Sequence, residues 1–372
     1  MTAVLRRLGT PQLLLTASLI TGAGLLMVWS ASAMRAELRF GSSTVYLWRQ
    51  LGGLALGLLL ALSAARIPLT TLRKLAPFAW GASVLAVAAT LTPLGVEHNG
   101  ARRWLALGPL EFQPLEVVKL GVVLGLAAWL AHAERRMDDW RASLAIPAAI
   151  AGLPALLLLI QPDFGGAVIL LAFTAVVVFV AGARLAHLGI AAVIALPLVA
   201  LVAVHRSYRM GRITSLLDPW ADPLGQSYQL VQSLISFGTG RLFGVGLGGG
   251  QQKLGFLPEA HTDFILSVIG EELGLIGVIG MLVAFAVLGL ASLGIASRAR
   301  DPFAMFTALG ASLLLWLQAA VNSGVSMGVL PTKGTTLPLV SYGRSSLVCS
   351  LIAIGLILNT ARPSKRGRSG WR

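Results

Sequence analysis

The chain has 372 residues, of which 56% are hydrophobic and only 12% are charged, about half the charged share of an average soluble domain. Its mean hydropathy is +0.80, so it lacks the polar surface that a soluble protein of this length needs. This composition excludes a disordered chain, a collagen and a coiled coil, and the long unbroken apolar runs differ from the alternating strands of a β-barrel. The sequence therefore predicts an all-α, polytopic membrane protein with a single helical bundle.

The formal net charge is +14, and the single cysteine, Cys349, lies inside an apolar run. Because cytoplasmic loops of membrane proteins are rich in Lys and Arg, the charge indicates a membrane orientation and not a nucleic-acid partner. One cysteine allows no intrachain disulfide and no thiolate metal cluster. The five histidines are scattered without the spacing of metal ligands.

About twenty apolar residues cross a bilayer as a helix, and the chain contains ten such predicted spans. They cover 11–33, 45–65, 75–94, 115–133, 143–160, 164–182, 184–204, 264–296, 303–327 and 336–360. The first is interpreted as an uncleaved span, because its apolar part is longer than the core of most signal peptides. The fifth and sixth are separated at Pro162 and Asp163, since these two residues together favour a turn.

Basic residues set the predicted orientation. With the N-terminus in the cytoplasm, most Lys and Arg residues fall in cytoplasmic segments, as the positive-inside rule requires. Ten spans then return the C-terminus to the cytoplasm, where 361–372 form a basic tail. Residues 1–372 are treated as one transmembrane domain, and the large loop 206–263, between the seventh and eighth spans, faces outward.

The loop 206–263 carries patterns of its own. Two Asp-Pro pairs, at 218 and at 222, are turn signals, and 226–237 places apolar residues on one helical face, which predicts an amphipathic helix at the membrane interface. The segment 244–250 is rich in glycine but lacks the Lys-Ser/Thr of a phosphate-binding loop. We therefore interpret it as a turn that glycine permits.

Ionisable residues at membrane depth are functional candidates, and four clusters lie on the outer side or in the outer half of the predicted bundle. They are Arg102 and Arg103 with Glu116 and Lys119; Asp163; Glu259, His261 and Asp263 with Glu271 and Glu272; and Lys333 with Arg344. Their convergence predicts one outward-facing site. Structural ion pairs, such as Lys119 with Glu116 or Glu272, are the alternative for individual members.

Asp263 immediately precedes the longest predicted helix. Ser267, Gly270, Gly274 and Gly277 fall near its direction on that helix, which predicts a face of small residues packed against a neighbouring helix. The helix would be about 50 Å long and would overshoot the bilayer. Asp263 is therefore expected near the headgroups, in reach of a lipid-linked polar substrate.

Distinctive motifs recur over nearly the whole chain. They include Asp-Pro-Trp-Ala-Asp-Pro-Leu-Gly at 218–225, Leu-Pro-Glu-Ala-His-Thr-Asp-Phe at 257–264, Glu-Glu-Leu-Gly at 271–274, Leu-Pro-Thr-Lys-Gly at 330–334 and Leu-Pro-Leu-Val-Ser-Tyr-Gly at 337–343, with further motifs at 99–104 and 161–165. Together they resemble the SEDS (shape, elongation, division and sporulation) family. The motifs at 258–261 and 331–334 are more similar to its FtsW division branch than to its elongation branch.

The resemblance implies a ten-helix peptidoglycan glycosyltransferase, which polymerises lipid II on the outer face of the cytoplasmic membrane during cell division. It implies a class B penicillin-binding protein as partner, with other division proteins at the septum. Asp263 matches the essential loop aspartate of the family, and we predict that it is the catalytic base for the acceptor hydroxyl. Substrate-binding roles are predicted for the other matching residues, Arg102, Lys119, Glu259, His261 and Lys333.

The leaving pyrophosphate of such a reaction needs its negative charge stabilised. Besides Arg102, Lys119 and Lys333, the cations Lys253 and Arg212 are candidates for this role. The sequence identifies no certain cofactor. It leaves open a divalent cation, Mg²⁺ or Mn²⁺, between the pyrophosphate and a carboxylate, because such ions often take only one or two protein carboxylates.

Three positions depart from the family pattern. Leu115 and Gly166 stand where the family usually has a hydroxyl residue, and Arg344 stands where it often has glycine. Family roles are therefore not transferred to these positions.

Two other functions stay open. A lipid II flippase would also place polar groups between helices, but the charges are biased to the outer half and no inverted repeat is visible. A non-catalytic scaffold for the penicillin-binding protein would tolerate a neutral residue in place of Asp263.

Overall fold

The apolar segments of the chain form long helices in the computed structural model, which describes residues 8–98, 100–108, 110–204 and 207–362. Each predicted span overlaps one of them: α2 (Thr10–Phe40), α3 (Val45–Arg66), α4 (Leu69–Ala89), α5 (Pro114–Ala133), α6 (Ile146–Ile160), α7 (Phe164–Val180), α8 (Leu185–Val204), α11 (Ile265–Ala296), α12 (Pro302–Ser326) and α13 (Arg344–Thr360). By length and composition, six helical segments of the described chain, those of α2, α3, α5, α6, α11 and α12, can cross a membrane. The chain is therefore a multi-pass membrane protein, and the number of ten spans stays a prediction.

Three predicted spans differ clearly from the structure in their boundaries. α2 continues to Phe40, whereas the predicted span ends at 33. α4 begins at Leu69, earlier than predicted, because Pro68 is compatible with the position before a helix. α13 begins at Arg344 and not at 336. The residues before it form a buried turn, which Gln50 of α3 holds by donating to the Ser341 carbonyl over 3.0 Å.

The prediction of an all-α chain is wrong between α4 and α5. Strands β1 (Gly95–His98), β2 (Ala101–Leu107) and β3 (Leu110–Phe112) form a three-stranded antiparallel sheet in that order. Gly100 and Gly108 have positive φ angles of 75° and 62°, which glycine adopts readily in tight hairpin turns. The strands are too short for their alternation to stand out from a linker between two spans.

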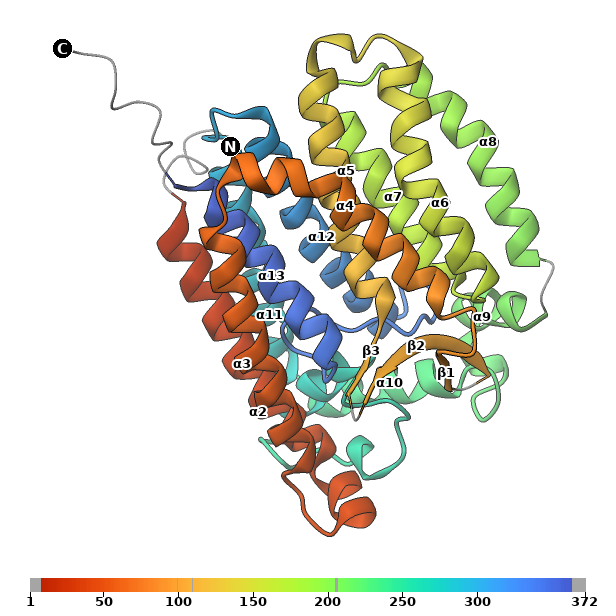
Figure 1. Ribbon diagram of the computed structural model, residues 1–372. Coiled ribbons are helices and arrows are strands. Elements are labelled where there is room, and N and C mark those ends of the chain that lie inside the picture. The colour runs from red at the N-terminus through yellow and green to blue at the C-terminus, as the bar shows by residue number, and fades with distance from the viewer. Residues whose placement is uncertain (1–7, 99, 109, 205–206, 363–372) are drawn as a thin grey trace.

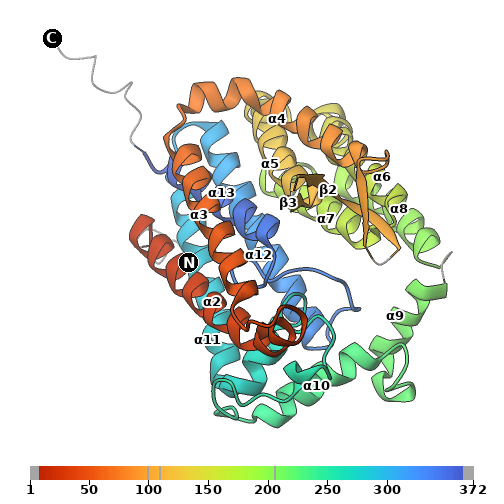
Figure 2. The same cartoon turned by 60° about the horizontal axis from the view of Figure 1, so that its bottom comes forward.

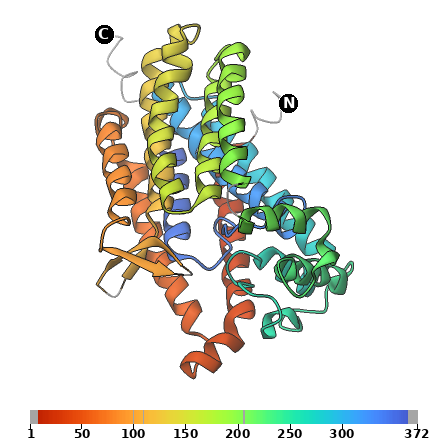
Figure 3. The same cartoon turned by 90° about the vertical axis from the view of Figure 1, so that its right-hand side faces the viewer.

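The helices lie side by side, and the sheet lies at the lower end of the bundle in Figure 1, together with α9 (Ser207–Leu217) and α10 (Tyr228–Gly240). The described chain begins and ends at the opposite end, and the side view in Figure 3 shows the same separation. Seen from below, α4 to α8 form one group of helices and α2, α3, α11 and α13 another (Figure 2). α12 joins the groups, because it packs against α5 and α7 as well as against α11 and α13.

The predicted loop 206–263 contains two α-helices, α9 and α10. Besides α9 and α10 it contains the short 3₁₀ turns η3 (Pro219–Ala221) and η4 (Gln252–Leu254). The predicted amphipathic helix over 226–237 is confirmed as α10, which buries Leu230 and Val231. Residue 206 of the predicted loop, and residues 363–372 of the predicted basic tail, lie outside the described residues.

The continuous helix predicted over 264–296 is wrong, because α11 breaks at Gly274, where φ is 67° and ψ is −167°. A side chain there would collide with the backbone of Leu242 and Gly244. The glycine-rich segment and the residues just before it form the backbone hydrogen bonds that the break removes from α11. The N–H groups of Val245 and Gly246 donate to the carbonyls of Glu271 and Glu272. The carbonyls of Arg241 and Leu242 accept from the N–H groups of Leu275 and Ile276. The interpretation of 244–250 as a glycine-permitted turn is thus confirmed.

Before this break, the small residues of α11 pack against α10. The hydroxyls of Ser267 and Ser233 lie 2.5 Å apart, and a side chain at Gly270 would overlap the ring of Phe237. The predicted close-packing face is therefore confirmed as far as Gly270. It does not extend to Gly277, where the nearest side chain is that of Leu273 in the same helix.

Candidate active site

Asp263 lies in a tight turn that leads into α11. Its N–H donates to the carbonyl of Glu259 over 3.1 Å, and Glu259 has a positive φ of 56°. The carbonyl of Asp263 accepts from the Asn322 amide of α12 over 2.7 Å, and the same amide donates to the Thr335 carbonyl over 2.5 Å. Asn322 therefore holds the Asp263 turn against the segment that follows α12.

The Asp263 carboxylate is half-buried between this segment and α9. A Cβ on Gly334 would lie 2.9 Å from its Oδ2 atom, so the absence of a side chain there lets the backbone approach. Burial and, next, the charge of Glu259 raise the pKa of Asp263 to about 7, while Arg212 and Lys333 oppose this rise. A carboxyl group with this pKa can accept a proton at neutral pH.

Lys333 is half-buried next to the start of α7. Its aliphatic stem occupies the space that a side chain on Gly165 would need. Burial lowers the pKa of Lys333 to about 8, and the charge of Asp163 opposes this shift. Lys333 also interacts electrostatically with Lys119, Glu116 and Arg103. It therefore links the surroundings of Asp263 with a second group of charges inside the bundle.

Lys119 and Glu116 form a buried ion pair in that second group. The Lys119 Nζ atom lies 2.7 Å from Glu116 Oε1 and 2.7 Å from Gln318 Oε1. Gln318 in turn donates to the Thr336 carbonyl over 3.1 Å. The alternative pairing of Lys119 with Glu116 is thus confirmed, and the pairing with Glu272 is wrong. The substrate-binding role of Lys119 stays a prediction.

The two neighbouring arginines of β2 lie in different surroundings. Arg102 is exposed and lies 3.5 Å from Glu97 on β1. Arg103 donates to the carbonyls of Gln161 and Pro162, over 3.4 and 2.7 Å, in the turn beside Asp163. Successive strand residues point to opposite faces, so the strand brings Arg103 to the Lys333 group. No described contact joins Arg102 with Asp263 or Lys333, and its predicted role remains untested.

Asp163 and Arg344 take up structural positions at helix starts. Asp163 caps α7 by accepting from the Gly166 N–H over 2.9 Å, and its charge acts on Lys333. Arg344 begins α13 and packs its stem against Gly53 of α3. No described contact joins Arg344 with Lys333, so the fourth predicted cluster is not brought together.

Glu259 and His261 flank Asp263 in sequence but differ in environment. Glu259 accepts from the Thr262 hydroxyl over 2.8 Å and lies 3.9 Å from Arg35. His261 is buried, with ring centroids 5.2 Å from Tyr46 and 5.6 Å from Tyr342. Burial lowers the pKa of His261 to about 4 although Glu259 opposes this, so the imidazole is neutral at pH 7. Their substrate-binding roles stay predictions.

Glu271, Glu272 and Lys253 form a separate group at the break of α11. Lys253 Nζ lies 2.6 Å from Glu272 Oε1, and Glu271 accepts from the Gln251 N–H over 2.8 Å. No described contact joins these residues with Asp263. The structure therefore splits the third predicted cluster in two.

The part of the chain that the structure describes contains no group of three or more His, Cys, Asp or Glu side chains that could hold a metal ion. An Mg²⁺ or Mn²⁺ ion that shares a pyrophosphate needs only one or two protein carboxylates. The charges of Asp263 and Glu259 interact, so these two carboxylates are candidates for that role. The divalent cation thus stays a prediction.

Sequence reasoning gave no role to two polar residues of α12, Gln318 and Asn322. Both are almost fully buried, and they hold Lys119 and the Asp263 turn. Their positions four residues apart on one helix were the available signal, because buried amides in an apolar helix need partners.

Comparison with known proteins identifies the family. A model of the FtsW, RodA and SpoVE family, described as "Cell cycle protein", matches residues 11–366. The chain belongs to this family. The predicted SEDS membership is confirmed.

Curated relatives are similar over almost their whole length. The probable peptidoglycan glycosyltransferase FtsW of Nitrosococcus halophilus is 46% identical, over 94% of this chain and 92% of the relative. The protein of the same name from Coxiella burnetii is 42% identical, over 91% of this chain and 92% of the relative.

Solved structures share the fold. One of them is a chain from work on the "structural coordination of polymerization and crosslinking by a peptidoglycan synthase complex". It superposes on this chain with a TM-score of 0.77 at 36% identity, and the match covers 95% of this chain and 97% of that one. The rod shape determining protein RodA of Thermus thermophilus superposes with a TM-score of 0.69, at 33% identity, and covers 94% of this chain and 95% of its own.

Proposed function

We propose that this chain is a peptidoglycan glycosyltransferase, which polymerises lipid II on the outer face of the cytoplasmic membrane during cell division. The observation that carries the proposal is the half-buried Asp263 carboxylate, which has a pKa near neutrality and lies beside Lys333 and Arg212. The names of the relatives support the activity. A lipid II flippase and a non-catalytic scaffold are the alternative functions that the experiment below distinguishes from this one.

Asp263 acts as the general base in the proposed reaction. As the acceptor sugar hydroxyl attacks the anomeric carbon of the donor, Asp263 takes the hydroxyl proton. The new glycosidic C–O bond forms while the bond between the anomeric carbon and the pyrophosphate oxygen breaks. The electron pair of that bond leaves with the pyrophosphate. A base in this role contributes typically 10²–10⁴ in rate.

The cations around Asp263 stabilise the leaving pyrophosphate. Lys333 and Arg212 both act on Asp263 electrostatically, and Arg103 adds positive charge near Lys333. Fixed cations in a partly desolvated site stabilise developing negative charge well. A bound Mg²⁺ or Mn²⁺ would share this charge, with Asp263 or Glu259 as protein ligand.

The remaining predicted residues take supporting places. Lys119 keeps the charges around Lys333 in position through its pair with Glu116. Glu259 and His261 shape the turn that carries Asp263, and Glu259 raises its pKa. The exposed Arg102 would meet a part of the substrate away from Asp263 and Lys333.

The proposal includes an orientation and a partner. We place the end of the bundle with the sheet and α10 outside, and the two chain termini in the cytoplasm, as the basic residues require. The partner is a class B penicillin-binding protein at the septum, with other division proteins. The similar chain from a complex that couples polymerization and crosslinking supports this choice.

The decisive experiment is a polymerisation assay on lipid II with the purified chain, with and without its partner. Asp263→Asn should form no detectable glycan strands, whereas the matched variant Asp138→Asn, in an exposed ion pair with Arg184, should retain activity. Translocation of lipid II without polymer from either version would favour the flippase. Absence of both activities in the unaltered chain would favour the scaffold.

A further inference from the structure

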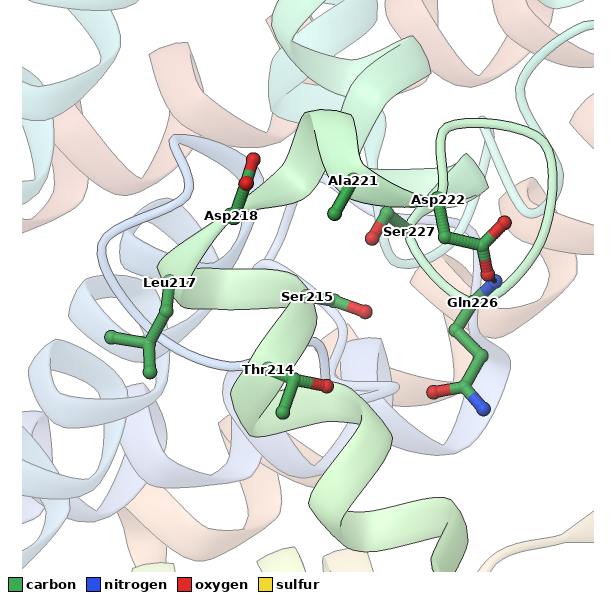
Figure 4. A pocket seen from close by; sticks show the side chains of 8 residues that line it. All are labelled: Thr214, Ser215, Leu217, Asp218, Ala221, Asp222, Gln226 and Ser227. Carbon is green, nitrogen blue, oxygen red and sulfur yellow. Dashed lines mark hydrogen bonds between the residues drawn. The ribbon is translucent and has the colours of Figure 1, made fainter.

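A pocket lies in the segment 206–263, between α9, η3 and the start of α10 (Figure 4). Its volume is about 310 Å³, which is within the usual range for small-ligand sites. The polar side chains that line it are Thr214, Ser215, Asp218, Asp222, Gln226 and Ser227. None of the candidate active-site residues described above lines this pocket.

Two largely buried serines direct their hydroxyls into this pocket. Ser215 on α9 is 4% exposed and Ser227 at the start of α10 is 2% exposed, and Figure 4 shows their hydroxyl oxygens directed into the space between the two segments. Within the described part of the chain, no hydrogen bond joins either hydroxyl to another group, and Ser227 does not cap α10 with its side chain. Both hydroxyls are therefore reached only through the pocket, where they are available to donate to a ligand and accept from it.

The rest of the polar lining is held in place by the local backbone. Asp218 accepts from the Trp220 N–H over 3.2 Å, and Asp222 accepts from the Gln226 N–H over 2.9 Å. Each bond uses one carboxylate oxygen, so the second oxygen of each group can accept from a ligand. The Gln226 amide lies against Gly211 of α9, where any side chain would overlap it. The pocket is therefore formed before a ligand enters.

The lining selects a ligand that both donates and accepts hydrogen bonds. The described lining residues include no Lys or Arg, and two carboxylates repel an anion such as pyrophosphate. Serine hydroxyls and a glutamine amide donate and accept, while carboxylates accept only. Sugar hydroxyl and acetamido groups match this set.

We propose that this pocket binds one N-acetylhexosamine unit of the glycan strand. The inference rests on the proposed function, because α9 connects the pocket with the candidate active site. Arg212 precedes Ser215 by one helical turn, about 5 Å along the axis. Arg212 acts on Asp263 and donates to the Thr332 carbonyl over 2.6 Å, next to Lys333. A strand that occupies the active site thus has a sugar subsite one turn of α9 away.

The test measures binding of a peptide-free tetrasaccharide of alternating N-acetylglucosamine and N-acetylmuramic acid to the purified full-length chain, by the change in tryptophan fluorescence. The unaltered chain should bind it saturably. The double variant Ser215→Ala/Ser227→Ala should bind at least about tenfold more weakly, because it loses two hydrogen bonds to the sugar. The matched variant Ser63→Ala, whose hydroxyl bonds the Leu59 carbonyl on exposed α3, should bind normally.

The melting temperature in detergent shows whether the double variant is folded. If it is folded and binds the tetrasaccharide as tightly as the unaltered chain, the pocket assignment is wrong. Lack of saturable binding by the unaltered chain overturns it as well. Displacement of the tetrasaccharide by a free stem peptide with a lysine ammonium would identify an ammonium site and overturn the saccharide assignment.

The variant Asp263→Asn separates this inference from the proposed function. It should bind the tetrasaccharide like the unaltered chain while it forms no polymer from lipid II. If it polymerises lipid II but the Ser215→Ala/Ser227→Ala effect on binding is observed, the catalytic assignment fails and the sugar pocket stands. If it does not polymerise and the double variant has no effect on binding, the sugar pocket fails alone.

Discussion

Two carboxylate–lysine regions of this molecule use the same residue types in opposite ways. At the break of α11, the Glu272 carboxylate is fully buried, lies 2.6 Å from Lys253 Nζ, and accepts further hydrogen bonds from the Ser30 hydroxyl and the Gly248 N–H. Asp263 has Lys333 and Arg212 as cationic neighbours, but in the described part of the chain no hydrogen bond to its carboxylate is formed.

The difference shows which of the two carboxylates can accept a proton from a substrate. A carboxylate whose oxygens already accept several hydrogen bonds has few lone pairs left for a substrate proton. Burial without such donors raises the pKa of Asp263 to about 7, into the range where a base is effective. The Glu272 region therefore holds the broken helix together, and the Asp263 region is the one suited to proton transfer.

The largest expected effect is the loss of polymerisation in Asp263→Asn. Asparagine keeps the size of the side chain but cannot take up a proton usefully at neutral pH, so the rate on lipid II should fall at least ~100-fold. Gel analysis of glycan strands from the purified protein measures it. Near wild-type polymer would make Glu259 the next candidate base and would remove the contrast drawn here.

The second prediction concerns stability, for which the substitution at Glu272 should have a larger effect than the substitution at Asp263. Glu272→Gln leaves the Lys253 ammonium buried without its partner, which typically costs about 3–5 kcal/mol. Asp263→Asn should be at least as stable as the unaltered chain at pH 8. The raised pKa means that the folded state favours protonated Asp263, so its anion lowers stability as pH rises above the unfolded value near 4, and asparagine removes that cost.

Thermal unfolding of both variants in the same detergent at pH 8 checks this reversal. A lower melting temperature for Asp263→Asn than for Glu272→Gln would show that Asp263 also holds the fold.

Lys333→Ala should lower polymerisation by roughly tenfold or more, since it removes a cation from the proposed pyrophosphate site. The protein should still insert in the membrane, because the side chain is only half-buried and lies outside the helices. Initial rates over a range of lipid II concentrations measure the effect. Unchanged kinetics would exclude Lys333 from the site.

The pH dependence of polymerisation should be bell-shaped. The rate should rise as pH increases through about 7, because Asp263 must lose its proton before it can act as a base. It should fall above about 8, as Lys333 becomes neutral. In Lys333→Arg the falling limb should move to higher pH, because arginine keeps its charge. A rising limb that persists unchanged in a weakly active Asp263→Asn would assign it to another group.

The smallest expected effect separates the two neighbouring arginines of β2. Arg103→Ala should reduce polymerisation more than Arg102→Ala, by a few-fold, because only Arg103 reaches the turn beside Asp163 and acts on Lys333. Side-by-side rates on lipid II measure the ratio. A larger loss in Arg102→Ala would place the substrate on the exposed face of the sheet.

The sequence alone determined the helices, the family and the position of Asp263. Hydropathy over about twenty residues is a local property, so each predicted span overlaps a helix. The helix α10 follows from its own periodicity. The motif at 257–264 identified Asp263 through the family. None of these conclusions depended on which helix faces meet.

Only the tertiary structure decided how the charges pair. The short strands of the sheet bring Arg103 and not Arg102 to Lys333, and the break at Gly274 assigns Glu272 to Lys253. The Lys119 ammonium donates to Glu116 on α5 and to Gln318 on α12. The pKa of Asp263 likewise depends on burial by segments far away in sequence. Pairing and burial are long-range properties, since a charged group responds to whatever the packing brings within a few ångströms and not to its neighbours in the chain.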